Sequence, residues 1–409
     1  MTTGRPTTGE QDPPRGQDAP GGSARTAPPV TAGALAPYDA VLLMSFGGPE
    51  RPEDVVPFLR RVTAGRGIPD ERLEEVGEHY YAFGGRSPIN DLNRDLLAAL
   101  RTETAARGID VPVVWGNRNW DPDGIDVLRE LYDAGARRVA MVATSAYGSY
   151  SSCRQYRQDV GRYVPALVAE GRPLVVDKVR PYFNDPGFVS ANADAVEESM
   201  RALGGEPHLM FVTHSIPTTM EVASGRRTTA TYAEQHEEVA RLVSAEVGRR
   251  LGRELDWSLT YCSRSGDPRT PWLEPDVNDA LRDLATTGRG SVVLSPIGFV
   301  SDHMEVVYDL DTEAAETAEE LGLRLARAAT AGTYAQFVAG LADLLLDRAA
   351  EARGVPAGAE GRRAVVGDLP AWESACAVAC CAVRDGVDDG RLALCGQPDD
   401  VVTAIEESA

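Results

Sequence analysis

Three carboxylates recur at four-residue intervals downstream of an apolar run: Glu305, Asp309 and Glu313. In a helix this spacing places all three on one face. Like charges at this spacing cost roughly 0.2–0.5 kcal/mol per pair in an isolated helix. The row follows a predicted strand end, which is where open α/β sheets bind ligands. It therefore predicts either a path for a cation or for protons, or an acidic face in contact with solvent.

A histidine lies at a comparable strand end. In the run Phe211-Val-Thr-His-Ser-Ile-Pro217, His214 stands where a buried strand gives way to a proline-containing turn. A neutral imidazole with an ordinary pKa of about 6.5 can accept a proton at physiological pH. A lone histidine here is more often structural, but His303 and Glu305 follow a second strand in the same way. These residues predict a site at the carboxyl edges of two sheets.

The six cysteines are unevenly distributed. Cys376, Cys380 and Cys381 lie within six residues, and Cys395 follows. In a reducing compartment such crowding indicates metal ligation rather than disulfides. Zinc and iron–sulfur clusters both take four ligands, so the fourth would be Cys395 or Cys153 from the body of the chain. Unliganded thiols on a tail are the alternative.

The composition narrows the class of protein. A net charge of −21 without a basic stripe argues against nucleic-acid binding. A hydrophobic content of 43% is typical of a globular protein. No apolar run approaches the roughly 18 residues of a membrane span, and no signal peptide begins the chain. We expect a cytoplasmic protein, with peripheral membrane contact left open.

Short apolar runs alternate with amphipathic segments, of which 89–104, 231–251 and 334–353 are predicted helices. The eight predicted strands are 40–46, 111–115, 139–144, 174–178, 209–213, 258–262, 291–296 and 323–328. Such alternation indicates parallel sheets with right-handed crossovers. We predict an α/β fold with two Rossmann-like lobes, each with a four-stranded parallel sheet and with a binding cleft between them.

Composition and the alternation of strands and helices divide the chain into four segments. Residues 1–36 are rich in Pro, Gly and Thr and predict a disordered tail. The first lobe is expected over residues 37–185 and the second over 186–353, with its last helix able to pack back on the first lobe. Residues 354–409 are expected to be a linker followed by the cysteine-rich extension.

Six segments together resemble the ferrochelatase family, whose members insert Fe²⁺ into a porphyrin. In chain order they are Leu43-Met-Ser-Phe-Gly-Gly-Pro-Glu50, Phe83-Gly-Gly-Arg-Ser-Pro-Ile-Asn90, Gly116-Asn-Arg-Asn-Trp120, Thr213-His-Ser-Ile-Pro217, Thr270-Pro-Trp-Leu-Glu-Pro-Asp276 and Pro296-Ile-Gly-Phe-Val-Ser-Asp-His-Met-Glu305. The resemblance runs from about Tyr38 to Arg353. It implies two Rossmann-like lobes with the porphyrin between them.

The resemblance also implies residue roles. His214 matches the catalytic histidine of the family, and Glu305 matches the glutamate across the cleft from it. Asp309 and Glu313 match an acidic row that relays metal or protons, so all four residues are expected along the route of Fe²⁺. His214 either accepts the pyrrole protons or holds iron, and we favour proton acceptance.

The porphyrin substrate is expected to contact Phe46, Arg60, Arg61, Ser87 and Tyr156. Phe46 stands where some bacterial relatives have a tyrosine, and phenylalanine cannot ligate iron. Actinobacterial relatives use coproporphyrin III, whose four propionates suit a polar cleft with cationic groups. Protoporphyrin IX is the alternative substrate. A chelatase for cobalt or nickel, or a non-catalytic haem-binding or iron–sulfur sensor protein, would be different functions.

The tail is similar to that of actinobacterial ferrochelatases, which holds a [2Fe-2S] cluster. The resemblance implies Cys153, Cys376, Cys380 and Cys381 as its ligands. Cys395 is a possible substitute, because the adjacent pair Cys380 and Cys381 would be cramped. Haem-pathway enzymes upstream and downstream are expected partners.

Overall fold

Each apolar run predicted to be a strand is a strand in the structure. The structure is a computed structural model, and it describes residues 33–65, 67–225, 230–265, 269–356, 359, 363–376, 380–383 and 390–394. The first four strands are β1 (Ala40–Ser45), β2 (Val113–Asn117), β3 (Arg138–Ala143) and β4 (Val175–Lys178), in the order β2-β1-β3-β4. The others are β5 (His208–His214), β6 (Trp257–Cys262), β7 (Ser291–Ser295) and β8 (Arg324–Arg327), in the order β6-β5-β7-β8. All neighbouring strands are parallel, which confirms the predicted fold class.

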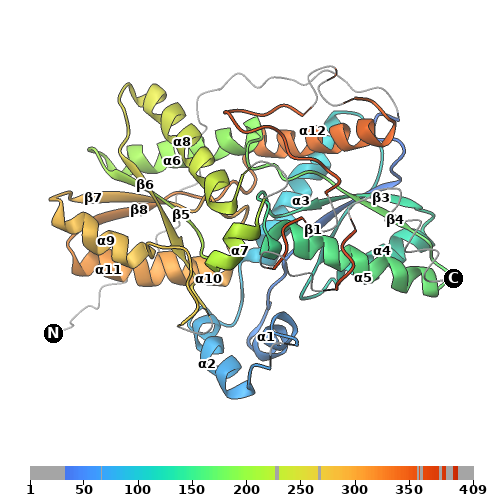
Figure 1. Cartoon of the computed structure of the whole chain (residues 1–409), viewed down its shortest axis with the longest axis horizontal. Helices are drawn as coiled ribbons and strands as arrows, with labels where there is room; N and C mark the ends of the chain where they lie inside the picture. The colour runs from blue at the N-terminus through green and yellow to red at the C-terminus, as the bar shows by residue number, and fades with distance from the viewer. Residues whose placement is uncertain are drawn as a thin grey trace, which may run out of the picture.

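Helices connect the strands and cover both faces of each sheet. They are α1 (Val55–Val62), α2 (Asp70–Tyr81), α3 (Ile89–Ala106), α4 (Gly124–Asp133), α5 (Gln155–Ala169), α6 (Pro186–Leu203), α7 (Thr218–Ala223), α8 (Tyr232–Leu251), α9 (Val277–Thr286), α10 (Met304–Tyr308), α11 (Ala314–Glu320) and α12 (Ala335–Ala352). Three short turns add to them: the 3-10 turn η1 (Pro52–Asp54) and the π turns η2 (Tyr150–Arg154) and η3 (Asp309–Glu313). Figure 1 shows the two sheets side by side, with α1 and α2 below the junction of the lobes.

The bounds of α8 illustrate how local sequence sets a helix. The Thr231 hydroxyl accepts from the Glu234 N–H and the Glu234 carboxylate accepts from the Thr231 N–H, a reciprocal cap that begins the helix. Gly252 ends it with φ of 69°, a left-handed conformation that glycine adopts without strain. The predicted span of 231–251 therefore agrees with the structure to within one residue.

The weakest predicted strand contains two arginines, and the structure shows how they are accommodated. Arg327 of β8 pairs with Asp302 at 2.8 Å and with Asp311 at 2.6 Å. Arg324 donates to the Leu203 carbonyl at 2.9 Å. Because β8 is at the edge of its sheet, these side chains reach partners outside the sheet.

A shared core joins the lobes. Helix α12 follows the last strand of the second sheet but packs against α3 of the first lobe and against α6. Buried residues of α3, α6, α8 and α12 belong to one hydrophobic cluster that reaches both sheets. Helices α4 and α5 cover the other face of the first sheet, and α9 and α11 that of the second (Figure 1). None of the helices within the described residues is long and apolar enough to span a membrane.

Two predicted boundaries need correction. Most of the predicted tail, residues 1–32, lies outside the described residues, but Gly33–Pro37 form a turn in which Leu35 is buried. Arg353 donates to the Ala34 carbonyl at 2.9 Å. The predicted linker is not a free spacer either, because Trp372 is only 2% exposed and packs in the shared core. Each segment contains one large apolar residue that the body buries.

Candidate active site

The end of β5 presents His214 to the space between the lobes. Its Nδ1 lies 2.5 Å from the Ser215 carbonyl oxygen. A carbonyl only accepts, so Nδ1 carries the proton and, in the neutral ring, Nε2 is free to accept. Nε2 lies 3.9 Å from Oε2 of Glu305. The structure thus brings together two residues that the sequence placed after different strands.

Glu305 belongs to a longer helix than α10 alone. Helix α10, η3 and α11 follow one another without interruption from Met304 to Glu320. In η3 the Ala314 N–H donates to the Asp309 carbonyl, five residues back. Four residues of an α-helix overshoot one turn by about 40°. In a π turn each residue advances by a smaller angle about the helix axis than in an α-helix. The turn therefore reverses part of this angular offset and brings Glu305 and Glu313 closer to a line parallel to the axis.

Asp309 is the most perturbed member of the acidic row. Burial raises its pKa to about 6, and Glu305 and Glu313 add to the rise, whereas a hydrogen bond from Ser263 opposes it. Ser263 follows β6 and donates its hydroxyl to the Asp309 carboxylate. Its φ of 60° is left-handed, which is uncommon for a serine. The backbone after β6 is therefore held in an uncommon conformation next to the acidic row.

The outer end of the row meets a second acidic group. Burial raises the pKa of Glu313, with further contributions from Asp276 and Glu316, while His79 lowers it. A pocket of about 340 Å³ lies nearby, lined by Ser215, Tyr261, Arg264, Leu273, Glu274, Pro275, Asp276 and Asp279. Its lining includes Ser215, the residue that follows His214.

Helix α2 of the first lobe lies across the acidic helix of the second. The rings of His79 and Tyr308 stack with centroids 3.9 Å apart and an interplanar angle of 5°. The next residue, Tyr80, is buried in a cluster with Phe58 and Met304. Burial raises the pKa of Tyr80, and Glu305 raises it further. Contacts between the lobes therefore flank the candidate site.

Of the five expected porphyrin contacts, Phe46 directly follows β1, while Arg60 and Arg61 lie on helix α1. Phe46 packs edge-to-face on Phe58 at 6.3 Å, in the cluster that contains Met304. The Arg61 guanidinium lies 4.7 Å from the centroid of the Trp120 ring. Arg60 is on the same helix but forms two hydrogen bonds with Asp70, at 2.7 and 3.0 Å. The structure therefore places Phe46 in this aromatic cluster and Arg61 beside it, and Arg61 pairs with Asp121 at 3.5 Å as Arg60 pairs with Asp70.

The other two expected contacts are buried. Ser87 is 3% exposed and packs against Gly48, where an added Cβ would lie 2.7 Å from the Ser87 Cβ. Tyr156 is 4% exposed in the core between β1–β4 and α5. The Arg118 guanidinium covers its ring at 4.9 Å. Neither side chain is open to a ligand in this arrangement.

Four of the predicted cluster ligands lie in a chain of thiol contacts. Cys153, in η2, contacts Cys376, which in turn contacts Cys380. The sulfurs of Cys380 and Cys381 are 3.6 Å apart. All four thiols are buried, and Cys395 lies outside the described residues. Within the described part of the chain, no group of three or more His, Cys, Asp or Glu side chains is arranged to hold a metal ion.

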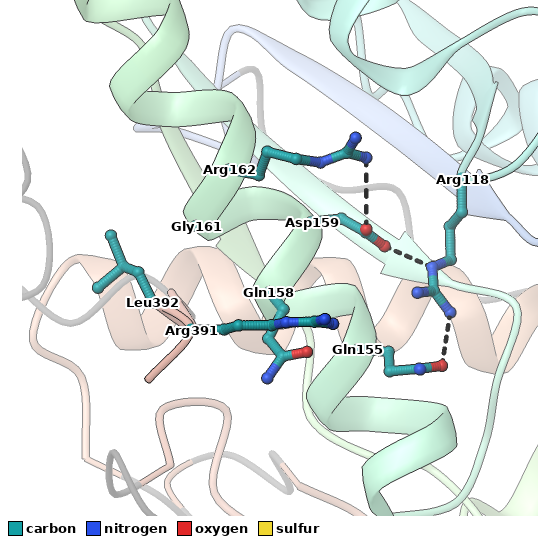
Figure 2. Close-up of a pocket in the computed structure, with 8 residues that line it drawn as sticks. All are labelled: Arg118, Gln155, Gln158, Asp159, Gly161, Arg162, Arg391 and Leu392. Carbon is teal, nitrogen blue, oxygen red and sulfur yellow. Dashed lines mark hydrogen bonds and ion pairs between the residues drawn. The ribbon is translucent and has the colours of Figure 1, made fainter. Parts of the chain in front are cut away.

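A larger pocket, of about 460 Å³, marks where the extension packs on α5. Its lining consists of Arg118, Gln155, Gln158, Asp159, Gly161, Arg162, Arg391 and Leu392 (Figure 2). Arg118 donates to Asp159 and, at 3.2 Å, to Gln155, so its charge is paired. The pocket does not include His214 or Glu305. We therefore place the candidate active site at the lobe junction and not in this pocket.

Several site residues were not predicted. Ser263 and His79 reach the acidic helix through contacts between segments far apart in the chain, Ser263 at Asp309 and His79 at Tyr308. Neither π turn has a sequence signal that distinguishes it from an α-helical turn.

Comparison with known proteins identifies the family of this chain. The family profile described as Ferrochelatase matches residues 38–349. The Coproporphyrin III ferrochelatase of Streptomyces coelicolor is 52% identical over 357 residues, which cover 85% of this chain and 94% of that protein. That of Leifsonia xyli subsp. xyli is 49% identical and covers 84% and 91%. The Ferrochelatase of Rhodopirellula baltica is 45% identical and covers 85% and 94%. This chain therefore belongs to the ferrochelatase family and is an enzyme of that family.

Proposed function

We propose that this enzyme inserts Fe²⁺ into coproporphyrin III and so forms iron coproporphyrin in haem biosynthesis. The observation that carries the proposal is the pair of His214 Nε2 and Glu305 Oε2, 3.9 Å apart in the second lobe and next to helix α2 of the first. The substrate is inferred from the relatives in Streptomyces coelicolor and Leifsonia xyli, which are named for coproporphyrin III.

His214 is proposed to accept the pyrrole protons. Insertion replaces two pyrrole N–H protons by one Fe²⁺, so two protons must leave for each iron that enters. With Nδ1 bound to the Ser215 carbonyl, Nε2 is the basic nitrogen that remains. Glu305 beside it stabilises the imidazolium that forms when a proton arrives. The pair therefore suits general-base catalysis near neutral pH.

The row of Glu305, Asp309 and Glu313 is proposed to relay metal or protons. Carboxylates suit hydrated divalent cations and can replace their water ligands stepwise. The pKa of Asp309, raised to about 6, allows this group to take up and release a proton close to physiological pH. Phe46 and Arg61 are proposed to contact the macrocycle and one of its propionates, while Arg60, Ser87 and Tyr156 would need to move to do so.

Anaerobic turnover with coproporphyrin III and protoporphyrin IX, measured side by side, tests the substrate. We expect Fe²⁺ to quench coproporphyrin fluorescence with a kcat/KM at least tenfold above that for protoporphyrin. A higher value for protoporphyrin would make it the substrate. Unchanged fluorescence with both porphyrins would favour a haem-binding or sensor protein.

A second proposal is that the buried thiols hold a [2Fe-2S] cluster. The residue types match a four-thiol donor set, because Cys153, Cys376, Cys380 and Cys381 lie in continuous contact, but in the described residues they are not arranged around a metal ion. The contact with Cys376 and burial raise the pKa of Cys153. Ligation would require loss of the thiol protons. When bound, such a cluster supplies one-electron redox chemistry.

Visible absorption with iron and sulfide analysis tests the cluster. We expect a coloured protein with about two irons and two sulfides per chain, and loss of both in Cys153→Ser. Cys262→Ser is the matched control, because Cys262 is also buried but lies in β6 of the other lobe. A colourless wild-type protein without iron or sulfide would remove this proposal.

A further inference from the structure

A network of hydroxyl and imidazole groups lies next to His214 in the chain and in space. Oγ1 of Thr213 lies 2.8 Å from the Tyr232 hydroxyl and 2.9 Å from Nε2 of His236. All three side chains are buried, and Thr213 and His236 have no exposed surface. Buried polar groups of this kind stabilise one arrangement when all their hydrogen bonds are made.

The tautomer of His236 determines which groups in this network donate and which accept. Its Nδ1 lies 2.7 Å from the Tyr232 carbonyl, which only accepts, so Nδ1 carries the proton. Burial lowers the pKa of His236 to about 3, which keeps the ring neutral. Nε2 must then accept, and the Thr213 hydroxyl is the donor beside it. With its own proton used, the Thr213 oxygen is left to accept from the Tyr232 hydroxyl.

The same tyrosine hydroxyl reaches the main chain of the catalytic candidate. It lies 3.1 Å from the His214 carbonyl oxygen, so its single proton is shared between this oxygen and Oγ1 of Thr213 in a three-centre hydrogen bond. The following peptide is held as well, since the Ser215 N–H donates to the Cys262 carbonyl and the Ser215 hydroxyl to the Leu273 carbonyl, each at 2.8 Å. The Ser215 carbonyl in turn accepts from the His214 ring. Fixing these two peptides therefore fixes the direction of Nε2.

Contacts from both lobes leave the network little freedom. The ring of Tyr147, from the first lobe, stacks on His236 with centroids 3.6 Å apart, and its hydroxyl donates to the Ile297 carbonyl at 3.0 Å. Gly298 packs so closely that an added Cβ would lie 2.1 Å from Oγ1 of Thr213. Neither the His236 ring nor the Thr213 hydroxyl can turn away without displacing a neighbour.

We propose that Thr213, Tyr232 and His236 are positioning residues for His214, which hold its main chain so that Nε2 faces Glu305. The inference rests on the proposed role of His214 as the proton acceptor. A group held in its reactive geometry acts without reorganisation during the reaction, so its loss should lower kcat more than binding. The effect is on the chemical step and not on the porphyrin contacts, none of which involves these residues.

The first test removes one hydroxyl without changing the shape of the side chain. For Thr213→Val we expect kcat to fall about tenfold, or about 1.4 kcal/mol of activation free energy. The Kd for coproporphyrin III, from fluorescence titration without iron, should stay within twofold of wild type. Thr213→Ser keeps the hydroxyl and should recover at least a third of the wild-type kcat.

Tyr232→Phe tests the next bond independently, in case Thr213→Val does not fold. We expect a similar fall in kcat, and a double variant less impaired than the sum of the single effects, because both break one network. Tyr334→Phe is the matched control. Its hydroxyl lies 2.8 Å from Glu198 on α6, outside the network, and we expect its kcat to equal that of wild type.

The outcomes separate the two proposals. A folded Thr213→Val or Tyr232→Phe variant with wild-type kcat would overturn the positioning role, as would a Thr213→Ser variant as slow as Thr213→Val. His214→Ala is measured in the same assay. If it retains turnover, the proposed role of His214 fails. If it is inactive while the network variants keep wild-type kcat, only the positioning inference fails.

Discussion

His214 and Asp309 occupy different environments within one site. His214 is about one-third exposed, and the Ser215 carbonyl determines which ring nitrogen is free. Asp309 is mostly buried among other carboxylates, which makes its ionised form unfavourable. His214 is thus available as a base. The ionised Asp309 carboxylate lowers the stability of the fold, and a functional role would explain this cost.

Asp309→Asn should stabilise the protein in a pH-dependent way. The native pKa of Asp309, about 6, is above its ordinary value of 3.8, so the native state binds the proton more tightly than the unfolded state does. Ionisation therefore destabilises the fold as pH rises from about 4 to 6, and the full cost is present above pH 6. Asparagine removes that cost. We expect a gain of about 1–3 kcal/mol in unfolding free energy at pH 7.5 that shrinks at pH 4.5.

Urea unfolding of both proteins at the two pH values measures this difference. Asp311→Asn is the matched control, because Asp311 is exposed and pairs with Arg327, so its loss should not stabilise the protein. A gain at pH 4.5 as large as at pH 7.5 would show that Asp309 titrates normally.

At the level of single residues, the sequence identified the candidate groups for the chemistry but not all of the residues that contact them. His214 and Glu305 could be named from the sequence because each follows a buried strand and each lies in a segment that resembles the ferrochelatase family. Ser263 was not, since its importance depends on a left-handed backbone and on a hydrogen bond to Asp309, 46 residues away. Tyr156 was expected at the porphyrin but is buried, because an aromatic residue near a strand end fits a core equally well.

The helix that carries the acidic row shows what periodicity can and cannot predict. Four-residue spacing correctly indicated a helix over Glu305–Glu313. It did not indicate the π turn, which adds one residue to a turn without changing composition. The stacking of α2 on α10 was also unpredictable, because His79 and Tyr308 belong to different lobes and share no local pattern.

His79→Ala should loosen this contact between α2 and α10. Aromatic stacking contributes about 0.5–1.5 kcal/mol, and less when one ring is exposed, as His79 is. We expect the KM for coproporphyrin III to rise two- to tenfold with kcat within twofold, because α2 covers the site but supplies no reacting group. Tyr308→Phe keeps the stacked ring and should behave as wild type. A fall in kcat at constant KM would instead place His79 in the chemical step.

At the scale of the whole molecule, alternation of strands and helices was sufficient to predict two parallel four-stranded sheets. The packing of the extension was not predictable, because residues 355–375 have the composition of a linker. The burial of one tryptophan shows how the extension packs on the body. Trp372 lies so close to Gly148 that an added Cβ there would be 2.0 Å from its ring, and it also packs on Phe183.

Trp372→Ala should therefore destabilise the protein as a core substitution does. Removal of a buried aromatic side chain costs about 3–5 kcal/mol. We expect a loss of that size in urea unfolding, whereas Leu392→Ala, at 39% exposure in the same extension, should change stability by less than about 0.5 kcal/mol. Equal effects of the two substitutions would mean that the extension does not dock on the body through Trp372.

The central claim, that His214 takes the pyrrole protons, is tested most directly by anaerobic single-turnover insertion of Fe²⁺ into coproporphyrin III by His214→Ala. The variant and wild type are compared at saturating porphyrin, with the Kd measured separately without iron. We predict a fall in the insertion rate of at least 10²-fold, typical of the loss of a general base, with the Kd within threefold of wild type. An insertion rate within tenfold of wild type, at unchanged Kd, would contradict the account.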